Sequence, residues 1–177
     1  MNLFLSPHSD DAALFGAFTL IREKPLVVTV TDSWVQWNRG EKISADMRWK
    51  EDQEAMKILG CPILLLGVRD DAIHDDVVRN ALYRFSGFDT VYAPAIQGGN
   101  PHHDLIGRIA KEMFPNVRQY ATYTKENLTP IGNEGIIPTR EEVDLKNKAL
   151  QCYQSQLNLP ATRPHFEAVF GRTEWFI

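Results

Sequence analysis

Residues 3–15, which read LFLSPHSDDAALF, contain the features that decide the fold. Residues 3–6 are short and mostly apolar, which predicts a first β-strand. From residue 11 onward apolar side chains recur at helical spacing, which predicts a helix over residues 11–23. The turn between the two, residues 7–10, holds the polar side chains. A strand that leads through a polar turn into a helix is the opening unit of an α/β domain.

The same alternation of strand and helix continues along the chain. Strands are predicted at 26–31, 62–66, 90–93 and 119–123, and helices at 44–59, 75–85, 103–114 and 140–157. Residues 33–43 and 125–138 are rich in polar and turn residues and are predicted as loops. The order predicts a Rossmann-like, doubly wound α/β fold with a mostly parallel sheet and helices on both faces. No linker or repeat divides the chain, so we expect one domain over residues 1–177.

Composition limits the classes of function. The chain has 177 residues, of which 44% are hydrophobic and 24% charged, and its formal net charge is −4. The acidic balance argues against nucleic acid as the partner. No long apolar run or signal peptide is visible, so no membrane association is expected and a cytoplasmic location is the default. Cys61 and Cys152 form no CxxC pair and are expected to be packing residues.

The first group of polar residues is Pro7-His8-Ser9-Asp10-Asp11. Two adjacent carboxylates repel each other, and a divalent cation would relieve that repulsion. His8 and Asp11 are close enough to bind one ion across a tight turn, and zinc accepts both donor types. Asp10 would then lie beside the ion, where a carboxylate can accept a proton. The alternative is that an aspartate merely caps the helix, and the residues alone leave these two interpretations equal.

The second group, Asn100-Pro101-His102-His103-Asp104, follows the strand at 90–93. The carboxyl ends of parallel strands meet at one edge of the sheet, so a histidine here can supply the third ligand of the first group. Two imidazoles and one carboxylate leave a fourth zinc position for water. Solvated histidines in a glycine-rich turn are the alternative.

These residues resemble the PIG-L/LmbE-like family of zinc-dependent de-N-acetylases, which carries a His-Pro-Asp-Asp-Glu motif and a later His-x-Asp-His motif. Two more stretches fit the family: Arg48-x-x-Glu51-x-x-Glu54-Ala55, and residues 146–156 with Lys146, Tyr153 and Ser155-Gln156. The resemblance implies a PIG-L-like domain over the whole chain. It also implies that His8, Asp11 and His103 bind Zn²⁺ or another divalent ion, with Asp10 as general base.

The chain departs from the second family motif at two positions. Asn100 replaces the first histidine, and His102 replaces the aspartate. Asn100 can donate a hydrogen bond to an oxyanion but cannot supply a proton, and His102 or Asp10 is expected to take over that task. Asp10, Asn100 and His102 are therefore the predicted catalytic residues.

Other residues are candidates for substrate contact. Arg48 is one, although an ion pair with Glu51 is slightly favoured for it. Arg69, in the sequence Arg69-Asp70-Asp71, follows a strand at the same edge, where the stretch could contact hydroxyls or a phosphate; a solvated loop is the alternative. Trp37, with Trp34 and Arg39, lies in a loop that could cover a sugar ring. His74 and His165 fit no ligand pattern and are expected to have surface or structural roles.

The resemblance implies a zinc-dependent amidohydrolase that removes an acetyl group from an N-acetylglucosamine-like sugar conjugate. The alternative is a catalytically impaired member of the family that only binds such a ligand. The changes at Asn100, at His102 and at Ala12, where the first motif has glutamate, motivate it. A third class, the dinucleotide-binding proteins, is disfavoured because no Gly-x-Gly-x-x-Gly follows the first strand. The expected partner is a small amino-sugar conjugate, and a homo-oligomer is compatible with the sequence.

Overall fold

A computed structural model describes residues 1–33, 37–38 and 41–177. Its main feature is a seven-stranded sheet in the order β5-β2-β1-β6-β7-β9-β8. Five strands are parallel: β1 (Leu3–Ser6), β2 (Leu26–Thr31), β5 (Ile63–Val68), β6 (Val91–Pro94) and β7 (Val117–Tyr120). At one edge β9 (Glu174–Phe176) runs antiparallel to β7, and β8 (Glu134–Ile136) runs antiparallel to β9. The predicted doubly wound, mostly parallel sheet is confirmed.

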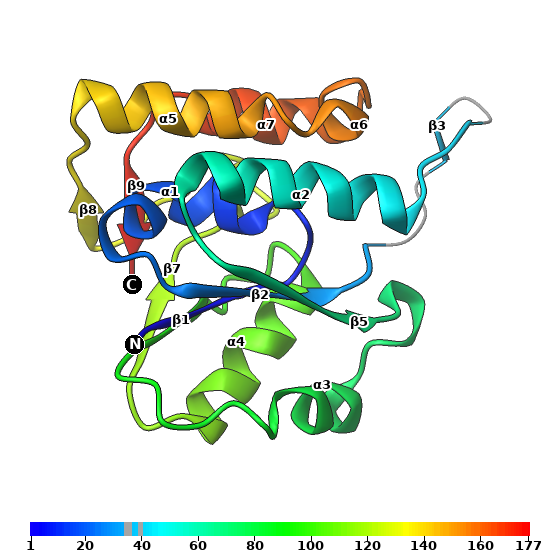
Figure 1. Cartoon of the computed structure of the whole chain (residues 1–177), viewed down its shortest axis with the longest axis vertical. Coiled ribbons are helices and arrows are strands. Elements are labelled where there is room, and N and C mark those ends of the chain that lie inside the picture. The colour runs from blue at the N-terminus through cyan, green and yellow to red at the C-terminus, as the bar shows by residue number, and fades with distance from the viewer. Residues whose placement is uncertain (34–36, 39–40) are drawn as a thin grey trace.

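Helices cover both faces of this sheet (Figure 1). On one face lie α1 (Asp11–Glu23) and α2 (Ala45–Leu59), with α5 (Arg140–Leu150), α6 (Gln154–Leu157) and α7 (Arg163–Val169). The other face carries α3 (Asp75–Leu82) and α4 (Pro101–Met113), and a short 3₁₀ turn at Asp70–Ala72 follows β5. No helix in the described part of the chain has the length and apolar content that crossing a bilayer requires.

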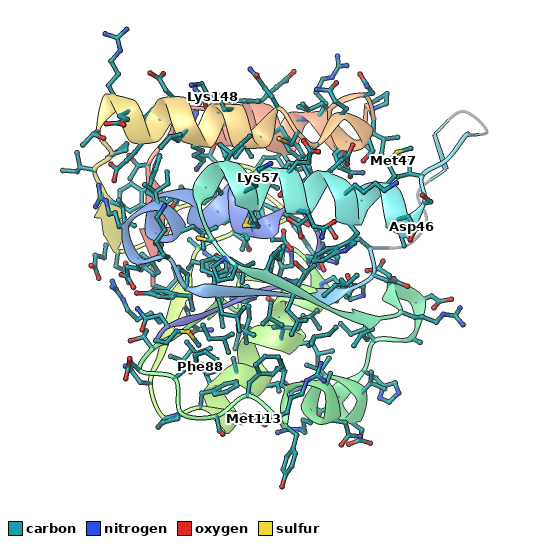
Figure 2. The ribbon with its side chains drawn as sticks, viewed as in Figure 1. Asp46, Met47, Lys57, Phe88, Met113 and Lys148 are labelled. Carbon is teal, nitrogen blue, oxygen red and sulfur yellow. The ribbon has the colours of Figure 1, made fainter. Side chains whose placement is uncertain are left out.

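Two hydrophobic cores lie on opposite faces of the sheet. Successive side chains of a strand alternate between faces, so in β1 Leu3 and Leu5 join one core and Phe4 joins the other. Figure 2 shows Phe88 and Met113 in the layer of α3 and α4, where both pack against the core that contains Leu3. Strand β1 is therefore buried on both faces of the sheet.

Local sequence explains several helix ends. The Ser44 side chain accepts a hydrogen bond from the amide of Met47 and caps α2, as predicted. Gly60 ends α2 with a φ of 74°, a left-handed conformation that favours glycine. Helix α4 begins at Pro101, two residues earlier than predicted, because Asn100 accepts the amide of His102 and Pro101 suits the first helical position.

Some expectations were wrong. The predicted loop at 33–43 contains a short antiparallel pair, β3 (Trp37–Asn38) and β4 (Glu41–Lys42). The predicted helix at 140–157 is interrupted, because Tyr153 leaves the helical conformation and its hydroxyl donates to Asp52 Oδ1 at 2.7 Å. Helix α7 and strand β9 had no counterpart among the predicted elements, because both are short and carry little periodicity.

Candidate metal centre

The site lies where the strand order of the sheet reverses. From β1 the chain proceeds to β2 on one side, whereas β6 lies on the other side of β1. Ligands of doubly wound sheets bind at this point, beyond the carboxyl ends of the two strands. Helix α1 follows β1 here and helix α4 follows β6, so each helix brings its first turn to the same place. The two polar groups found in the sequence therefore lie together.

His8, Asp11 and His103 converge on one point. Asp11 Oδ2 lies 3.0 Å from His8 Nδ1 and 3.1 Å from His103 Nε2. The same oxygen accepts the backbone amide of His8 at 2.8 Å, which closes the turn. The three ligand atoms lie within 4.8 Å of one another, and two imidazoles with a carboxylate are a donor set that zinc accepts.

The environment of His103 fits a bound cation. The residue is only 1% exposed. Within the described part of the chain neither ring nitrogen makes a hydrogen bond of normal geometry, although Nε2 faces Asp11. A buried polar atom without a partner is costly, and a metal ion at Nε2 would satisfy it. This arrangement disfavours the alternative of solvated histidines.

Neighbouring side chains of this group shift the pKa values of Asp11 and His8. Burial favours the neutral form of Asp11, but the neighbouring His103 and His8 outweigh it and hold the pKa of this carboxyl well below its usual range. Burial lowers the pKa of His8, but the Asp11 carboxylate outweighs burial and raises it overall. The structure therefore keeps a carboxylate ionised between two imidazoles, as a cation site requires.

Asp10 lies beside this group and has a different environment. It occupies the N-cap position of α1, but its side chain makes no capping hydrogen bond, which argues against the capping alternative. Arg48 of α2 pairs with it, Nη2 to Oδ2 at 3.1 Å. Burial raises the pKa of Asp10 despite the attraction of Arg48. Asp10 therefore makes no capping bond in the turn, and it lines the pocket beside the candidate metal ligands.

The ion pair expected between Arg48 and Glu51 is wrong. Among the described residues Arg48 pairs with Asp10, whereas Glu51 accepts hydrogen bonds from the amide and hydroxyl of Ser155. The reason is that α2 packs with Arg48 directed to the site, while Glu51 fixes the start of α6. Arg48 is 5% exposed and lines the pocket described next.

A pocket with a volume of about 270 Å³ opens over the site, at the small end for ligand pockets. Six of the residues predicted from the sequence line it: His8, Asp10, Asp11, Arg48, Asn100 and His102. His103 lies beneath them. Arg69 does not line the pocket; its side chain is 65% exposed and pairs with Asp71. Trp34, Arg39 and the Trp37 side chain lie outside the described residues.

Asn100 has both polar atoms engaged. Its oxygen caps α4, and its Nδ2 donates to the Tyr123 hydroxyl at 3.1 Å. The capping hydrogen bond to the amide of His102 explains why an asparagine suits the start of α4. It leaves Asn100 as a residue that orients Tyr123 at the pocket wall.

Asp70 lines the pocket, as the position of Arg69-Asp70-Asp71 after β5 at the same edge of the sheet suggested. Tyr123 and His165 also line it, with ring centroids 4.4 Å apart. The sequence predicted neither Tyr123 nor His165 as a residue of the site, and the structural role expected for His165 fits its edge-on packing against Tyr123. A lone histidine on the short helix α7 gives no sequence signal for the site, because only tertiary packing brings α7 there.

Solved structures with the same fold come from enzymes with different reactions. A 4-carboxy-2-hydroxymuconate hydratase, GalB from Pseudomonas putida KT2440, is 18% identical, with a TM-score of 0.70 over 95% of this chain and 82% of that chain. The A40926 pseudoaglycone deacetylase Dbv21 is 21% identical, with a TM-score of 0.68 over 98% and 94%. The zinc-inhibited form of the teicoplanin deacetylase Orf2 is 19% identical, with a TM-score of 0.67 over 99% and 97%. At these identities the likeness shows the fold alone.

Comparison of the sequence itself with known proteins gives a family. Among the curated proteins none matches this chain significantly. The profile of the PIG-L family, described as GlcNAc-PI de-N-acetylase, matches residues 3–114. That segment is more than half of the chain and includes His8, Asp10, Asp11 and His103. The chain therefore belongs to the PIG-L de-N-acetylase family.

Proposed function

We propose that this protein is a metal-dependent hydrolase that removes the acetyl group from an N-acetylglucosamine-like sugar conjugate. The observation that carries the proposal is the convergence of His8, Asp11 and the buried His103 beneath a pocket lined by Asp10. Membership of the PIG-L family supports the same reaction. A divalent ion such as Zn²⁺, held by these three residues, supplies Lewis acidity that activates water and polarises the amide carbonyl.

Asp10 is the proposed general base. The raised pKa of Asp10 lies closer to neutral pH than that of an ordinary aspartate, which suits a group that both accepts and returns a proton. Arg48 holds the carboxylate at 3.1 Å and keeps it directed into the pocket. Asp10 accepts the proton of the attacking water, and the same proton is then available for the departing amine.

His102 is the proposed second proton donor. It lines the pocket, and Asn100 fixes its backbone at the start of α4. Burial lowers the pKa of His102 and the nearby His8 lowers it further, so its protonated form is disfavoured and it can donate only after it accepts a proton during the reaction. Asn100 orients Tyr123, whose hydroxyl lies at the wall where a carbonyl oxygen or a sugar hydroxyl would bind.

The second candidate is a family member that binds an amino-sugar conjugate without hydrolysing it. The observation in its favour is that Asn100 stands where the family motif has histidine and has both polar atoms engaged in structure. If His102 does not replace the missing acid, binding would persist without turnover.

Release of primary amine distinguishes the two candidates. The protein would be freed of metal by a chelator, reloaded with Zn²⁺, and incubated with a panel of N-acetylglucosamine conjugates. We expect amine release that requires the ion and disappears on chelation. Binding of a conjugate, measured by calorimetry, with no amine released by the loaded protein would refute the hydrolase and favour the binding protein.

A further inference from the structure

A second group of metal-binding side chains lies on the other side of His8. Its members are His8, Asp70 and His102, which come from the turn after β1, the 3₁₀ turn after β5, and α4. His8 Nε2 lies 3.0 Å from His102 Nδ1. Asp70 Oδ1 lies 3.6 Å from each of these two nitrogens. The three atoms form a nearly regular triangle.

The size of this triangle fits a metal ion, although its His8–His102 edge is also the length of a hydrogen bond. Zinc bonds of about 2.0–2.1 Å in a tetrahedral site place neighbouring donor atoms about 3.3 Å apart. The observed separations of 3.0 and 3.6 Å lie on either side of that value. A separation of 3.6 Å is too long for a hydrogen bond, so Asp70 approaches both rings without bonding to either.

The two imidazoles at 3.6 Å are the ion-pair partners of Asp70 Oδ1 in the described part of the chain. This Oδ1 atom is buried and accepts no hydrogen bond there. The adjacent Arg69 does not neutralise it, because Arg69 pairs with Asp71. The turn is fixed by the amide of Asp70, which donates to Asp32 Oδ1 at 3.1 Å. A buried carboxylate oxygen aimed at two imidazole nitrogens calls for a cation.

We propose that Asp70, His102 and Nε2 of His8 form a second divalent-metal site beside the first. The two sites use opposite nitrogens of the His8 ring, because Nδ1 faces Asp11 and Nε2 faces Asp70. A neutral imidazole keeps one N–H, so occupation of both sites requires His8 to lose that proton. The second ion therefore binds more weakly than the first. An ion at the second site would also occupy Nδ1 of His102, which could then not act as the second proton donor.

Metal stoichiometry tests this proposal. The full chain, freed of metal, would be titrated with Zn²⁺ by calorimetry, and bound zinc would be counted by elemental analysis of protein equilibrated with excess ion. We expect two ions per chain in the wild type and one in Asp70→Asn. Asp71→Asn is the matched control, since it changes the neighbouring exposed carboxylate, and should retain two. Asp11→Asn should retain only the ion at the second site.

Two results would overturn the second site: a single bound ion in the wild type, or two ions in Asp70→Asn. The thermal midpoint of each metal-free variant, equal to that of the wild type, excludes misfolding as the cause of a lost ion. Metal stoichiometry and amine release are separate measurements, so failure of the second site can be told apart from failure of the hydrolase proposal. Two ions without amine release would support the site and count against the reaction, whereas one ion with amine release would do the reverse.

Discussion

At the scale of single residues, Asp10 carries the proposed chemistry without binding the ion. Its side chain pairs with Arg48 and makes no capping bond, so its replacement leaves the turn intact. We predict that Asp10→Asn retains the first metal ion but lowers kcat by about 10²–10⁴-fold, the contribution typical of a general base. Steady-state amine release together with elemental analysis measures both. Unchanged kcat with full metal content would remove Asp10 from the mechanism.

Asp52 is a second residue whose ionisation matters, in this case for stability. It is fully buried and accepts hydrogen bonds from the hydroxyls of Tyr153 and Thr29. Burial raises the pKa of Asp52 to about 7, against an unfolded value of about 3.9. Between these values the folded chain holds a proton that the unfolded chain has lost, so stability falls as the pH rises from 4 to 7.

Replacing Asp52 by asparagine keeps a neutral side chain at every pH. We predict that Asp52→Asn is close to the wild type in stability at pH 4.5 and more stable at pH 8, by up to about 4 kcal/mol from the pKa difference. Urea denaturation at the two pH values measures the effect. Asp46→Asn, an exposed position of the same helix labelled in Figure 2, should show no such difference. An equal stability change at both pH values for Asp52→Asn would contradict a protonated Asp52.

At the scale of secondary-structure elements, the position of α4 depends on Gly107. A Cβ at this residue would lie 2.2 Å from the carbonyl oxygen of Pro94, so α4 packs directly against the end of β6. The first turn of α4 carries His103. A side chain at 107 would push the helix outward and move His103 away from Asp11.

We therefore predict that Gly107→Ala destabilises the fold by about 1–3 kcal/mol, the usual cost of overpacking, and also weakens zinc binding. Lys111→Ala, at an exposed position of the same helix, is the control and should change neither quantity. Denaturation and zinc titration of both variants check this. Wild-type zinc affinity in Gly107→Ala would show that α4 does not set the geometry of the site.

A buried ion pair connects three elements on the face opposite α4. Lys146 of α5 lies 2.9 Å from Glu174 of β9, and Glu174 also accepts the amide of Phe18 in α1. Burial raises the pKa of Glu174, and Lys146 opposes that rise. Both side chains are almost completely buried, so each depends on the other for neutralisation.

Removing one partner of this pair should cost more than removing both. We predict that Lys146→Met lowers the free energy of unfolding by about 3–5 kcal/mol, because Glu174 is left buried without its counter-charge. Adding Glu174→Gln to that variant should recover a large part of the loss, since the amide oxygen still accepts from Phe18. A double variant no more stable than Lys146→Met would argue that packing, not charge, dominates at this position.

At the scale of the whole molecule, the elements and site residues that could be predicted from the sequence are those that depend on local patterns. Strand β1, helix α1 and the Ser44 cap follow from periodicity and capping chemistry, and the switch point follows from the order of the elements. His8 and Asp11 share one turn, so their convergence was visible in the sequence. His103 needed the family resemblance to be chosen over His102, since adjacent histidines have the same chemistry.

What the sequence did not predict depends on contacts between distant segments. Arg48 pairs with Asp10 only because α2 packs beside the start of α1, and the spacing to Glu51 suggested a different partner. His165 reaches the pocket from α7, and Tyr153 interrupts its helix to reach Asp52. No local pattern carries that information, because tertiary packing overrides helical propensity at such positions.

The central claim is that one ion is shared by His8 and Asp11, which lie in one turn, and by His103 from a distant segment of the chain. Anomalous diffraction at the zinc absorption edge, from crystals grown with one equivalent of Zn²⁺, locates the ion directly. We predict a peak about 2.0–2.2 Å from a ring nitrogen of His8, a carboxylate oxygen of Asp11 and Nε2 of His103. A bound ion that lacks any one of these three ligands, or no peak at this position, would contradict the account.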